Sequence, residues 1–441
     1  MATSSAGEVP EPCVAETPSL RVVVVGRSVY GLHGVGGLER HLYDLLRHHL
    51  ADGWHVTLVT RTPGGSHGVD PERWRLVASH PRFRACFVPY RTFPFAGRRG
   101  TTVVDRSTAY PWFGRRAGRL AASLVSRGEA DIVYGVGASA WGYAVARAGG
   151  ARAPLVFNPQ GLEEFGGIDG RYGGQRLKGL GYLPLRAVVK RTAHASDAVI
   201  ATDRAIRPTV LYHLGVDPAA VRLIPNGIDV VDADQLVDEA AGRALRAAHG
   251  IDPSETLLLS VGRVEENKGF GDLAAALAAA RPDRSWRWVL VGDGPARAAL
   301  AAQVHAAGLG ARVLLAGRTD DRTLHAWYDA TDVFVHPTRY EGSSLVTLEA
   351  MLHRRAVIAT RAGGLPDKVV PDATGWLTQP GSPAALAATL EQAFSQRERW
   401  AAYGQAGRAL LEQTFDWRVI QSRFAELYAE LVSKALHPAR G

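Results

Sequence analysis

Short apolar runs recur along the chain, and most of them end in a glycine or proline that is followed by a helix-length segment. RVVVVG (21–26) is a continuous β-branched run, which is typical of a strand buried on both faces of a parallel sheet. After it, Leu38, Leu42, Leu45 and Leu46 recur at the spacing of one helix face. Further strands are predicted at HVTLVT, RACFVP, DIVYGV, PLVFNP, DAVIAT and VRLIPN. This alternation predicts a doubly wound α/β domain.

The same pattern begins again near residue 256. Strands are predicted at TLLLSVG, WRWVLVG, ARVLLAG, DVFVHP and AVIAT, with alanine-rich helical segments between them. A polar, turn-rich segment separates the two halves. We therefore predict a Rossmann-like domain over 20–230, an interdomain segment over 231–252 and a second Rossmann-like domain over 253–414, facing the first across a cleft. Ligands of such parallel sheets bind beyond the carboxyl ends of the strands.

The charge of the chain favours anionic partners. The 441 residues carry a net charge of +8, from 51 Lys and Arg against 43 Asp and Glu, and the basic residues are spread along the whole sequence. No nucleic-acid partner is expected, because there is no zinc-finger spacing, no basic region leading into heptads and no alternation of aromatic and basic residues. A phosphate-bearing small molecule or an anionic membrane surface would suit the charge equally well.

The N-terminal segment and the number of cysteines indicate in which cellular compartment the protein is expected. Residues 1–19 have neither a basic segment nor an apolar segment of a signal peptide, and they are expected to form a disordered arm. Cys13 and Cys86 are too few for a disulfide framework or a cysteine metal site. No run of about 18 apolar residues occurs. We expect a cytoplasmic protein without a transmembrane helix, which could lie at the periphery of the inner membrane face.

Two loops have features of phosphate sites. GLHGVGGLER contains Gly36 and Gly37 between a strand and a helix, so its amides can approach an anion, although a glycine-rich turn without a ligand fits equally well. SVGRVEENKGF places Arg263 and Lys268 just beyond a strand end. A guanidinium and an ammonium together suit a diphosphate. The alternative is an ordinary basic loop.

EGSSLVTLEA (341–350) contains two carboxylates eight positions apart. Glu341 is expected in a loop after a strand and Glu349 inside the next helix. At about 100° per residue the two would not share a helix face, so they do not form a pair that flanks one bond. Each could instead accept hydrogen bonds from hydroxyl groups on either side of a bound phosphate. The alternatives are a turn carboxylate and a solvated helix position.

The start of this helix is a second candidate phosphate site. Ser343 or Ser344 is expected to cap the helix. The backbone amides around Ser344, Leu345 and Val346 would then form a positive helix end.

The order of these motifs resembles a known family. The glycine-rich loop, PNGID, GRVEENKG, EGSSLVTLEAM and AGGLPD follow one another as in the family 4 retaining glycosyltransferases of the GT-B fold, and the resemblance covers residues 21 to 432. It implies that the helix in 415–441 crosses back onto the first domain. It also implies a metal-independent transfer of a hexose-type sugar from a nucleoside-diphosphate sugar, with retention of anomeric configuration. The acceptor would be a glycan, a lipid or a small molecule.

The resemblance assigns roles to charged residues of the second half. It places Arg263 and Lys268 at the donor diphosphate, where they stabilise the leaving group, and Glu341 at the donor sugar hydroxyls. These three are the predicted catalytic residues. Glu349 would hold the nucleotide ribose.

The resemblance also assigns the remaining donor contacts. The amides of Gly36 and Gly37 would meet the phosphates from the first domain. Arg318, in the loop after ARVLLAG, would lie at the nucleobase. No cofactor and no metal are implied.

The chain departs from the family at three points. Gln160, in NPQGLEEF, stands where many members have a histidine, and an amide cannot act as a general base. Gln160 and Gly161 could still contact the donor sugar or the acceptor. Ser343 and Ser344 replace a usual aromatic residue and a glycine, and Asp367 replaces a glutamate. Acceptor contacts are expected from residues 160–167 and from RTFPFAGRRG.

Several other features have two interpretations. DAD (232–234) resembles a metal-binding string, but a solvated turn or helix start fits its place better, and no metal is predicted. His336 is expected to have a structural or donor-lining role, and His33 to be a loop residue. LPLRAVVKRTAH (183–194) forms either a helix packed in the core or a surface for anionic lipid, with Leu185 and Val188 on its apolar face.

Two other functions remain open. A nucleotide-sugar epimerase can share the fold, but it is expected to lack the combination of GR-x4-KG with the two spaced glutamates. A non-catalytic nucleotide-sugar-binding protein is the other alternative, and Gln160 is the feature that favours it.

Overall fold

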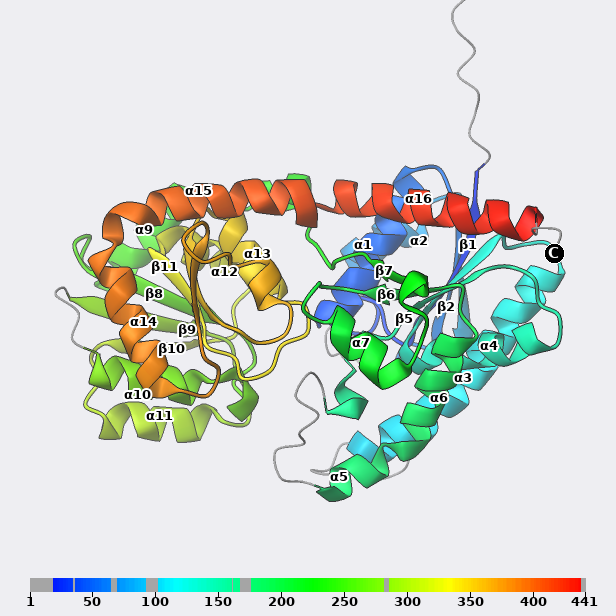
Figure 1. Ribbon diagram of the computed structural model, residues 1–441. Coiled ribbons are helices and arrows are strands. Elements are labelled where there is room, and N and C mark those ends of the chain that lie inside the picture. Colours follow the sequence, from blue (N-terminus) through cyan, green and yellow to red (C-terminus); the bar gives the residue numbers. More distant parts are fainter. Residues whose placement is uncertain are drawn as a thin grey trace, which may run out of the picture.

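The computed structural model describes residues 19–34, 36–64, 70–92, 102–160, 162–166, 176–280 and 285–437. In these ranges the chain forms two parallel β-sheets, each with helices on both faces (Figure 1). Apart from Ser19, the arm expected over residues 1–19 lies outside the described ranges.

The first sheet, within the described residues, has seven parallel strands in the order β3-β2-β1-β4-β5-β6-β7. The strands are β1 (Arg21–Val25), β2 (His55–Arg61), β3 (Phe83–Val88), β4 (Ile132–Val136), β5 (Leu155–Asn158), β6 (Ala198–Ala201) and β7 (Val221–Leu223). The helices of this part are α1 (Gly37–Ala51), α2 (Pro71–Ala78), α3 (Thr102–Ser126), α4 (Trp141–Ala148), α5 (Arg176–Gly181), α6 (Leu183–His194) and α7 (Arg207–Leu214). The strand order reverses between β1 and β4, so the loops after these strands diverge at a topological switch point.

Strand β1 shows why its sequence reads as a continuous apolar run. Val22 and Val24 enter a core that includes leucines of α1, while Val23 and Val25 enter the core on the opposite face, which includes Phe113 of α3. Successive side chains of a strand point to opposite faces, so a strand covered on both sides needs apolar residues at every position.

The second sheet, in the described part of the chain, has six parallel strands in the order β10-β9-β8-β11-β12-β13. The strands are β8 (Thr256–Val261), β9 (Trp286–Val291), β10 (Val313–Gly317), β11 (Val333–His336), β12 (Ala356–Thr360) and β13 (Gly375–Thr378). The helices that precede or cover it are α8 (Val230–Asp234), α9 (Glu239–Ala248), α10 (Phe270–Ala279), α11 (Arg297–Ala306), α12 (Asp321–Ala330), α13 (Leu345–Leu352), α14 (Pro383–Ser395) and α15 (Trp400–Leu410). Here the order reverses between β8 and β11, the strands that precede the loops of Lys268 and Glu341.

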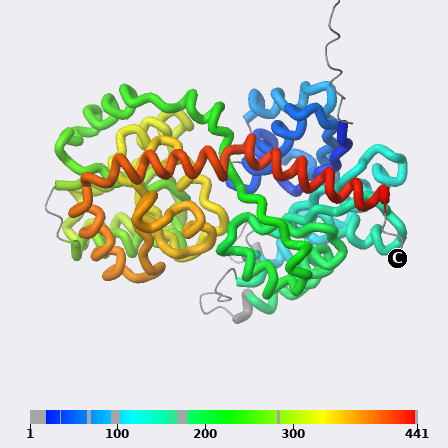
Figure 2. Tube along the Cα trace, turned by 45° about the horizontal axis from the view of Figure 1, so that its top comes forward, coloured from blue at the N-terminus to red at the C-terminus, as the bar shows by residue number. Residues whose placement is uncertain are grey.

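Helix α16 (Trp417–Leu436) crosses from the second sheet back to the first (Figures 1 and 2). Its buried side chains, including Trp417, Phe424 and Tyr428, share a core with Leu42 and Leu45 of α1. The predicted crossing of the C-terminal helix and the predicted pair of doubly wound sheets are therefore confirmed. The domain limits expected at 230/231, 252/253 and 414/415 stay predictions.

The carboxyl ends of the two sheets face each other. Gly37, at the start of α1, lies so close to Leu345 of α13 that a Cβ at Gly37 would be 3.6 Å from its Cδ1 atom. Asp203, just after β6, forms an ion pair of 2.6 Å with Lys368, which follows β12 in the second part. Loops after strands of both sheets are thus in contact, as ligand binding between two such sheets requires.

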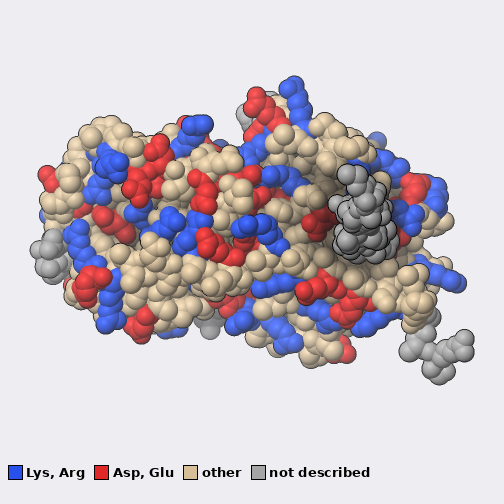
Figure 3. Space-filling view, turned by 90° about the horizontal axis from the view of Figure 1, so that it is seen from above, with Lys and Arg blue, Asp and Glu red and all other residues tan. Residues whose placement is uncertain are grey.

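The basic surplus forms no single patch on the face seen from above, where Lys and Arg alternate with Asp and Glu (Figure 3). Helix α6 has the expected bounds, and its apolar residues Leu185, Val188 and Val189 are buried in the core. The packed-helix interpretation is confirmed, and the lipid surface suggested for that face is wrong. Across the described ranges, no helix is both long enough and apolar enough to span a membrane.

Candidate active site

The loops that follow β8 and β11 are joined through their backbones. The carbonyl of Asn267 accepts hydrogen bonds from the Thr338 hydroxyl at 3.1 Å and from the Arg339 amide at 2.8 Å. Gly269 has a φ of +69°, and a Cβ there would lie 2.0 Å from the carbonyl oxygen of Pro337. Only glycine fits this close approach. Lys268, directly before it, is therefore held against the loop of Glu341.

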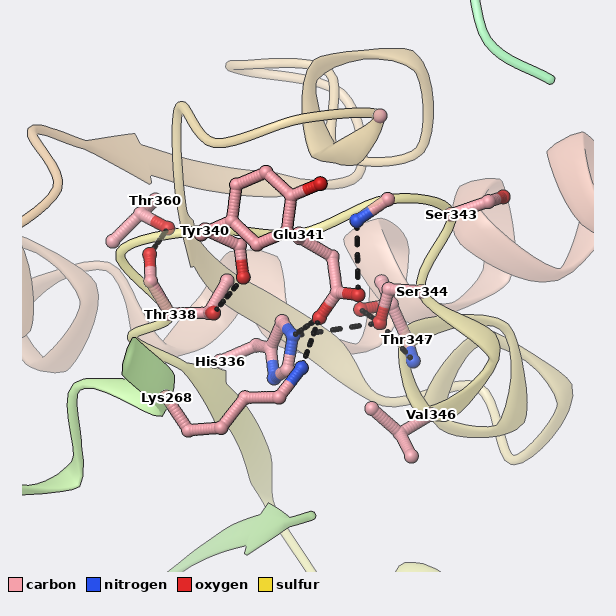
Figure 4. Close-up of polar contacts among 12 residues, drawn as sticks. Lys268, His336, Thr338, Tyr340, Glu341, Ser343, Ser344, Val346, Thr347 and Thr360 are labelled. Atoms are coloured by element: carbon pink, nitrogen blue, oxygen red, sulfur yellow. Dashed lines mark hydrogen bonds and ion pairs between the residues drawn. The ribbon is translucent and has the colours of Figure 1, made fainter. Parts of the chain in front are cut away.

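Glu341 accepts hydrogen bonds from three groups (Figure 4). Lys268 Nζ and His336 Nε2 each lie 2.9 Å from Oε2, and the amide of Gly342 lies 3.2 Å from Oε1. Burial raises the pKa of the Glu341 carboxyl, but the hydrogen bond from His336 and the charge of Lys268 outweigh it, so the pKa lies below its usual range. Glu341 is therefore an ionised acceptor and is unsuited to be a general acid.

Lys268 keeps hydrogen-bonding capacity in this arrangement. An ammonium group has three donors, and Glu341 takes one of them. The remaining N–H groups can bind oxygen atoms of a ligand. The imidazole of His336 is buried and donates from Nε2, because a carboxylate can only accept.

Helix α13 starts beside this carboxylate. Ser344 is its N-cap, and the Ser344 hydroxyl accepts a hydrogen bond of 3.3 Å from the Thr347 amide. The first helical residues, Leu345 and Val346, have amides without an i−4 partner in the helix, which leaves them available to an anion. Gly37 lies against Leu345, so the glycine-rich loop of the first sheet meets this helix end.

Glu349 lies in the same helix but in a different environment from Glu341. Its Oε2 accepts a hydrogen bond of 2.9 Å from the Tyr328 hydroxyl, and its Oε1 lies 3.5 Å from Arg40 Nη1. Burial raises the pKa of Tyr328 well above its usual value, so Tyr328 stays protonated and donates. The two carboxylates thus have separate partners, as their spacing predicted.

Arg40 joins the site from the first sheet. It is in the first turn of α1, and its Nη2 lies 3.4 Å from the Asp321 carboxylate at the start of α12. The guanidinium also lies 5.2 Å from the ring centroid of Tyr30. One side chain of the first part thus contacts two carboxylates of the second.

Two predicted donor residues stand apart from this cluster. Arg263 follows β8 but is 69% exposed, and its partner is Glu265, at 3.0 Å, rather than Glu341. Arg318 directly follows β10 and is exposed. The structure places both at carboxyl ends of strands of the second sheet without joining either to Lys268.

Gln160 has an uncommon backbone conformation. Its φ is +62°, its amide donates to Asn158 Oδ1 at 3.0 Å, and its side-chain Nε2 is buried without a partner among the described residues. Left-handed conformations of non-glycine residues are concentrated at functional sites. Gly161 and Gly167 lie outside the described residues, as do residues 93–100 of RTFPFAGRRG.

Two residues of this site were not predicted from the sequence, and the role of a third was left undecided. Tyr328 and Arg40 were not predicted as site residues, and His336 was left between a structural and a donor-lining role. Arg40 follows the paired glycines by three positions, and His336 ends the strand that precedes Glu341. The positions of Arg40 and His336 relative to these motifs were the signals from which their roles could have been inferred.

The DAD string lies in α8, and its two aspartates form ion pairs with arginines. Asp232 Oδ2 is 2.5 Å from Arg47 Nη1, and the Asp234 carboxylate accepts from two nitrogens of Arg408 at 2.6 and 2.7 Å. These carboxylates join α8 to α1 and α15. Over the described ranges, no group of three or more His, Cys, Asp or Glu residues is arranged to hold a metal.

Comparison with known families gives two matches that together span most of the chain. Residues 35–232 match the model described as Glycosyltransferase Family 4. Residues 243–410 match the model described as Glycosyl transferases group 1.

Curated relatives are similar at about 30% identity. The alpha-maltose-1-phosphate synthase of Mycobacterium tuberculosis is 30% identical over 273 residues, which are 57% of this chain and 68% of the relative. The enzyme of that name from Mycolicibacterium smegmatis is 31% identical over 55% of this chain and 66% of its own length. A D-inositol 3-phosphate glycosyltransferase of Xylanimonas cellulosilytica is 31% identical over 56% of this chain. In that case the chain spans 59% of the relative's length.

Solved structures with the same fold cover nearly the whole chain. Sucrose-phosphate synthase from Thermosynechococcus elongatus superposes with a TM-score of 0.70 at 24% identity, covering 94% of this chain and 99% of its own. The Anabaena protein HepE in complex with UDP has a TM-score of 0.70 at 21% identity, covering 93% and 100%. At these identities the likeness shows the fold, which is GT-B.

Proposed function

This chain belongs to family 4 of the retaining glycosyltransferases, and from that premise we propose that it transfers a hexose from a nucleoside-diphosphate sugar to an acceptor, with retention of anomeric configuration. The observation that carries the proposal is the ionised Glu341, held by Lys268 and His336 beside the N-terminus of α13. A hydrogen-bond acceptor, a cation and a helix N-terminus then lie next to one another. They are the groups needed for sugar hydroxyls joined to a diphosphate.

The donor is proposed to lie with its sugar at Glu341 and its ribose at Glu349. The diphosphate between them would meet the amides of Leu345 and Val346, the free donors of Lys268 and the Gly36–Gly37 loop. The contact of Gly37 with Leu345 supports this placement, since it brings both loops to one point. Arg263 would reach the phosphates only after leaving Glu265, and Arg318 is proposed for the nucleobase.

The transfer exchanges one bond at the sugar C1 atom for another on the same face. The bond from C1 to the phosphate oxygen breaks, and a bond from C1 to the acceptor oxygen forms. The departing phosphate takes the acceptor proton. Lys268 and the helix amides stabilise the charge that develops on the phosphate, and each charge-assisted hydrogen bond that strengthens there is worth roughly 1.5 to 3 kcal/mol.

This route needs no side chain that moves a proton. The amide of Gln160 cannot act as a base, and Glu341 is held ionised by its partners. Gln160 is proposed to hydrogen-bond the donor sugar or the acceptor through its unpartnered Nε2. Its left-handed backbone turns the chain directly beyond β5, where such a contact would be made.

The test is a panel of UDP-, GDP- and ADP-hexoses, assayed for free nucleotide with and without acceptors. Structures of the Anabaena relative with UDP-glucose make UDP-hexoses the first choice. We expect acceptor-dependent nucleotide release, a product with the donor's anomeric configuration by NMR, and loss of most turnover in Glu341→Ala. Glu430→Ala is the matched control, because Glu430 pairs with a lysine on the exposed side of α16.

The alternatives predict different products. An epimerase would convert the donor sugar without releasing the nucleotide into a glycoside. A binding protein would show tight donor binding without turnover, and Glu341→Ala would not alter what turnover exists. Either result would replace the transferase proposal.

A further inference from the structure

Two arginines at the carboxyl edge of the first sheet have no acidic partner among the described residues. Arg27 follows β1 and Arg61 ends β2, and the two strands are neighbours. No Asp or Glu in the described residues forms an ion pair with either guanidinium, and Arg61 Nε is buried without a hydrogen-bond partner there. The stretches 65–69 and 93–101, which lie outside the described residues, contain no Asp or Glu in their sequence. Buried or half-buried cations are ordinarily paired.

Both guanidinium groups lie over one aromatic ring. The Cζ atoms of Arg27 and Arg61 are each 5.9 Å from the ring centroid of Tyr90, which follows β3, and Arg27 is also 4.8 Å from that of Tyr110 in α3. The Tyr110 hydroxyl in turn donates to the carbonyl of Val136 at the end of β4. The arginines at the ends of β1 and β2 and the tyrosines beside them therefore lie where four adjacent strands end, with the guanidinium groups over the aromatic rings.

The backbone at each arginine is also fixed. The carbonyl of Arg27 accepts a hydrogen bond of 3.2 Å from the Thr60 hydroxyl, and that of Arg61 accepts one of 2.8 Å from His33 Nε2. His33 Nδ1 accepts from the Val29 amide, so the imidazole is the neutral form protonated at Nε2. The arrangement is thus built before any ligand arrives.

Two acidic residues, Glu39 and Asp105, act electrostatically on Arg61, but among the described residues neither forms an ion pair with Arg27 or Arg61. Asp105 accepts a hydrogen bond of 3.0 Å from the Tyr90 hydroxyl and lies beyond ion-pair distance of both arginines. Burial and the charge of Arg27 lower the pKa of Arg61, while Glu39 and Asp105 raise it to a smaller extent. Two cations that repel each other in a half-buried place are stabilised by an anion between them.

This edge adjoins the proposed donor site. Residues 27–36 run from Arg27 to the Gly36–Gly37 loop, which is proposed to meet the donor phosphates, and Tyr30 within them contacts Arg40 of the ribose site. We propose that the acceptor carries an anionic group, a phosphate or a carboxylate, which Arg27 and Arg61 bind. The inference rests on the proposed transferase function and names the class of acceptor.

Binding of anionic sugars to the free protein tests this without any transfer. Glucose 6-phosphate, glucuronate and neutral glucose are titrated by calorimetry into wild type, Arg27→Gln, Arg61→Gln and both Arg→Lys variants. We expect at least one anionic sugar to bind and glucose not to bind, with the affinity falling tenfold or more in each Gln variant. The Lys variants should retain part of the affinity, since they keep the positive charge but lose the bidentate geometry of the guanidinium.

Two controls locate the site. Arg84→Gln removes an arginine of β3 that is paired with Glu129, and it should bind as wild type does. Lys268→Ala removes a cation of the donor site, so unchanged anion binding there shows that the ligand is not in the donor diphosphate position. The preference between phosphate and carboxylate tells the two sources of charge apart.

The proposal is overturned if neither anionic sugar binds at millimolar concentration, if glucose binds equally well, or if the Gln variants bind as wild type does. Circular dichroism verifies the fold of each variant, and the Lys variants serve where a Gln variant does not fold. Donor turnover is measured separately. Its absence would count against the transferase function, whereas arginine-independent binding would count against this site alone.

Discussion

Arg40 of the first sheet's helix α1 lies 3.5 Å from the carboxylate of Glu349 in helix α13 of the second. The residue proposed to hold the donor ribose is therefore positioned by a side chain from the opposite half of the molecule. Arg40 also contacts Asp321, so it draws two acidic groups of the second part toward α1. If Glu349 holds the donor ribose as proposed, donor binding would be coupled to the approach of the two halves through this guanidinium.

Replacement of Arg40 should weaken donor binding more than it slows the transfer step. Without Arg40, Glu349 keeps Tyr328 as a partner but loses its contact across the two halves. We expect Arg40→Ala to raise the donor dissociation constant about five- to thirtyfold, which corresponds to ~1 to 2 kcal/mol. Arg40→Lys should recover part of the loss. Calorimetry with the donor and steady-state kinetics measure the two effects.

Arg47→Ala is the matched control for Arg40, because Arg47 lies on the same helix and has its own ion pair with Asp232. Its donor affinity should match wild type. Unchanged donor affinity in Arg40→Ala would contradict the positioning role.

Removal of the Lys268 ammonium should slow transfer more than tenfold with the fold intact. The ammonium both neutralises Glu341 and is proposed to stabilise the departing phosphate, and one such interaction is worth roughly one to two powers of ten in rate. Turnover of Lys268→Ala is measured at saturating donor, with circular dichroism as the test of folding.

Lys434→Ala provides the comparison for Lys268. Lys434 also forms an ion pair with a glutamate, at 2.6 Å, but it is 68% exposed on α16. Equal turnover of Lys268→Ala and Lys434→Ala would remove Lys268 from the catalytic residues.

The sheets could be predicted from sequence because burial on both faces demands apolar residues throughout a strand. Val22 to Val25 show this directly, since alternate residues enter opposite cores. Strand β13 (Gly375–Thr378) escaped prediction. It has four residues, begins with glycine and ends with threonine at the edge of the sheet, so it lacks the apolar run that marked the other strands.

The site could be predicted only as far as local motifs reach. Glu341 and Glu349 were found from their spacing around a helix start, and the structure gives them separate partners as expected. The contact between Arg40 and Glu349 could not be predicted from the sequence, because the two residues lie 309 positions apart and their contact depends on how the two halves of the molecule meet. The left-handed conformation of Gln160 likewise leaves no mark in the sequence, since glutamine does not favour it.

Removal of one partner alone from the ion pair between Asp203 and Lys368 should strongly destabilise the protein. Both side chains are fully buried, their charged atoms are 2.6 Å apart, and Lys368 has one further hydroxyl partner, Ser343, at 3.1 Å. We expect Lys368→Met to lower the free energy of unfolding by about 3 to 5 kcal/mol, because it leaves a buried carboxylate uncompensated. Urea denaturation measures this.

A double variant separates the pair from its surroundings. Asp203→Asn with Lys368→Met removes both charges, so its loss should be smaller than the two single losses combined. Arg222→Gln breaks a partly exposed pair with Glu430 and should cost under about 1 kcal/mol. A loss of that small size for Lys368→Met would show that the buried pair is not a stabilising contact between the two halves.

Mild acid should weaken the packing of α16 on α1 through His49. His49 Nδ1 lies 2.8 Å from Gln421 Oε1, and Gln421 Nε2 donates to Asp52, so the amide is oriented and His49 is the neutral form protonated at Nδ1. Burial lowers the pKa of His49 to about 3, against the opposing hydrogen bond with Gln421. In the unfolded chain the imidazole takes up a proton near its ordinary pKa of about 6.5.

Between these two pKa values the unfolded state binds more protons, so the free energy of unfolding falls as the pH falls from about 6.5 toward 3. From pH 7.5 to pH 5 this residue should account for a loss of about 2 kcal/mol. His49→Gln stays neutral and can still donate to Gln421. Between pH 7.5 and pH 5 its free energy of unfolding should therefore fall by about 2 kcal/mol less than that of wild type. His55→Gln, at an exposed position of β2, should keep the wild-type dependence. Urea unfolding of the three proteins at pH 7.5 and pH 5 measures the difference, and parallel pH dependence in wild type and His49→Gln would show that His49 is not the titrating group.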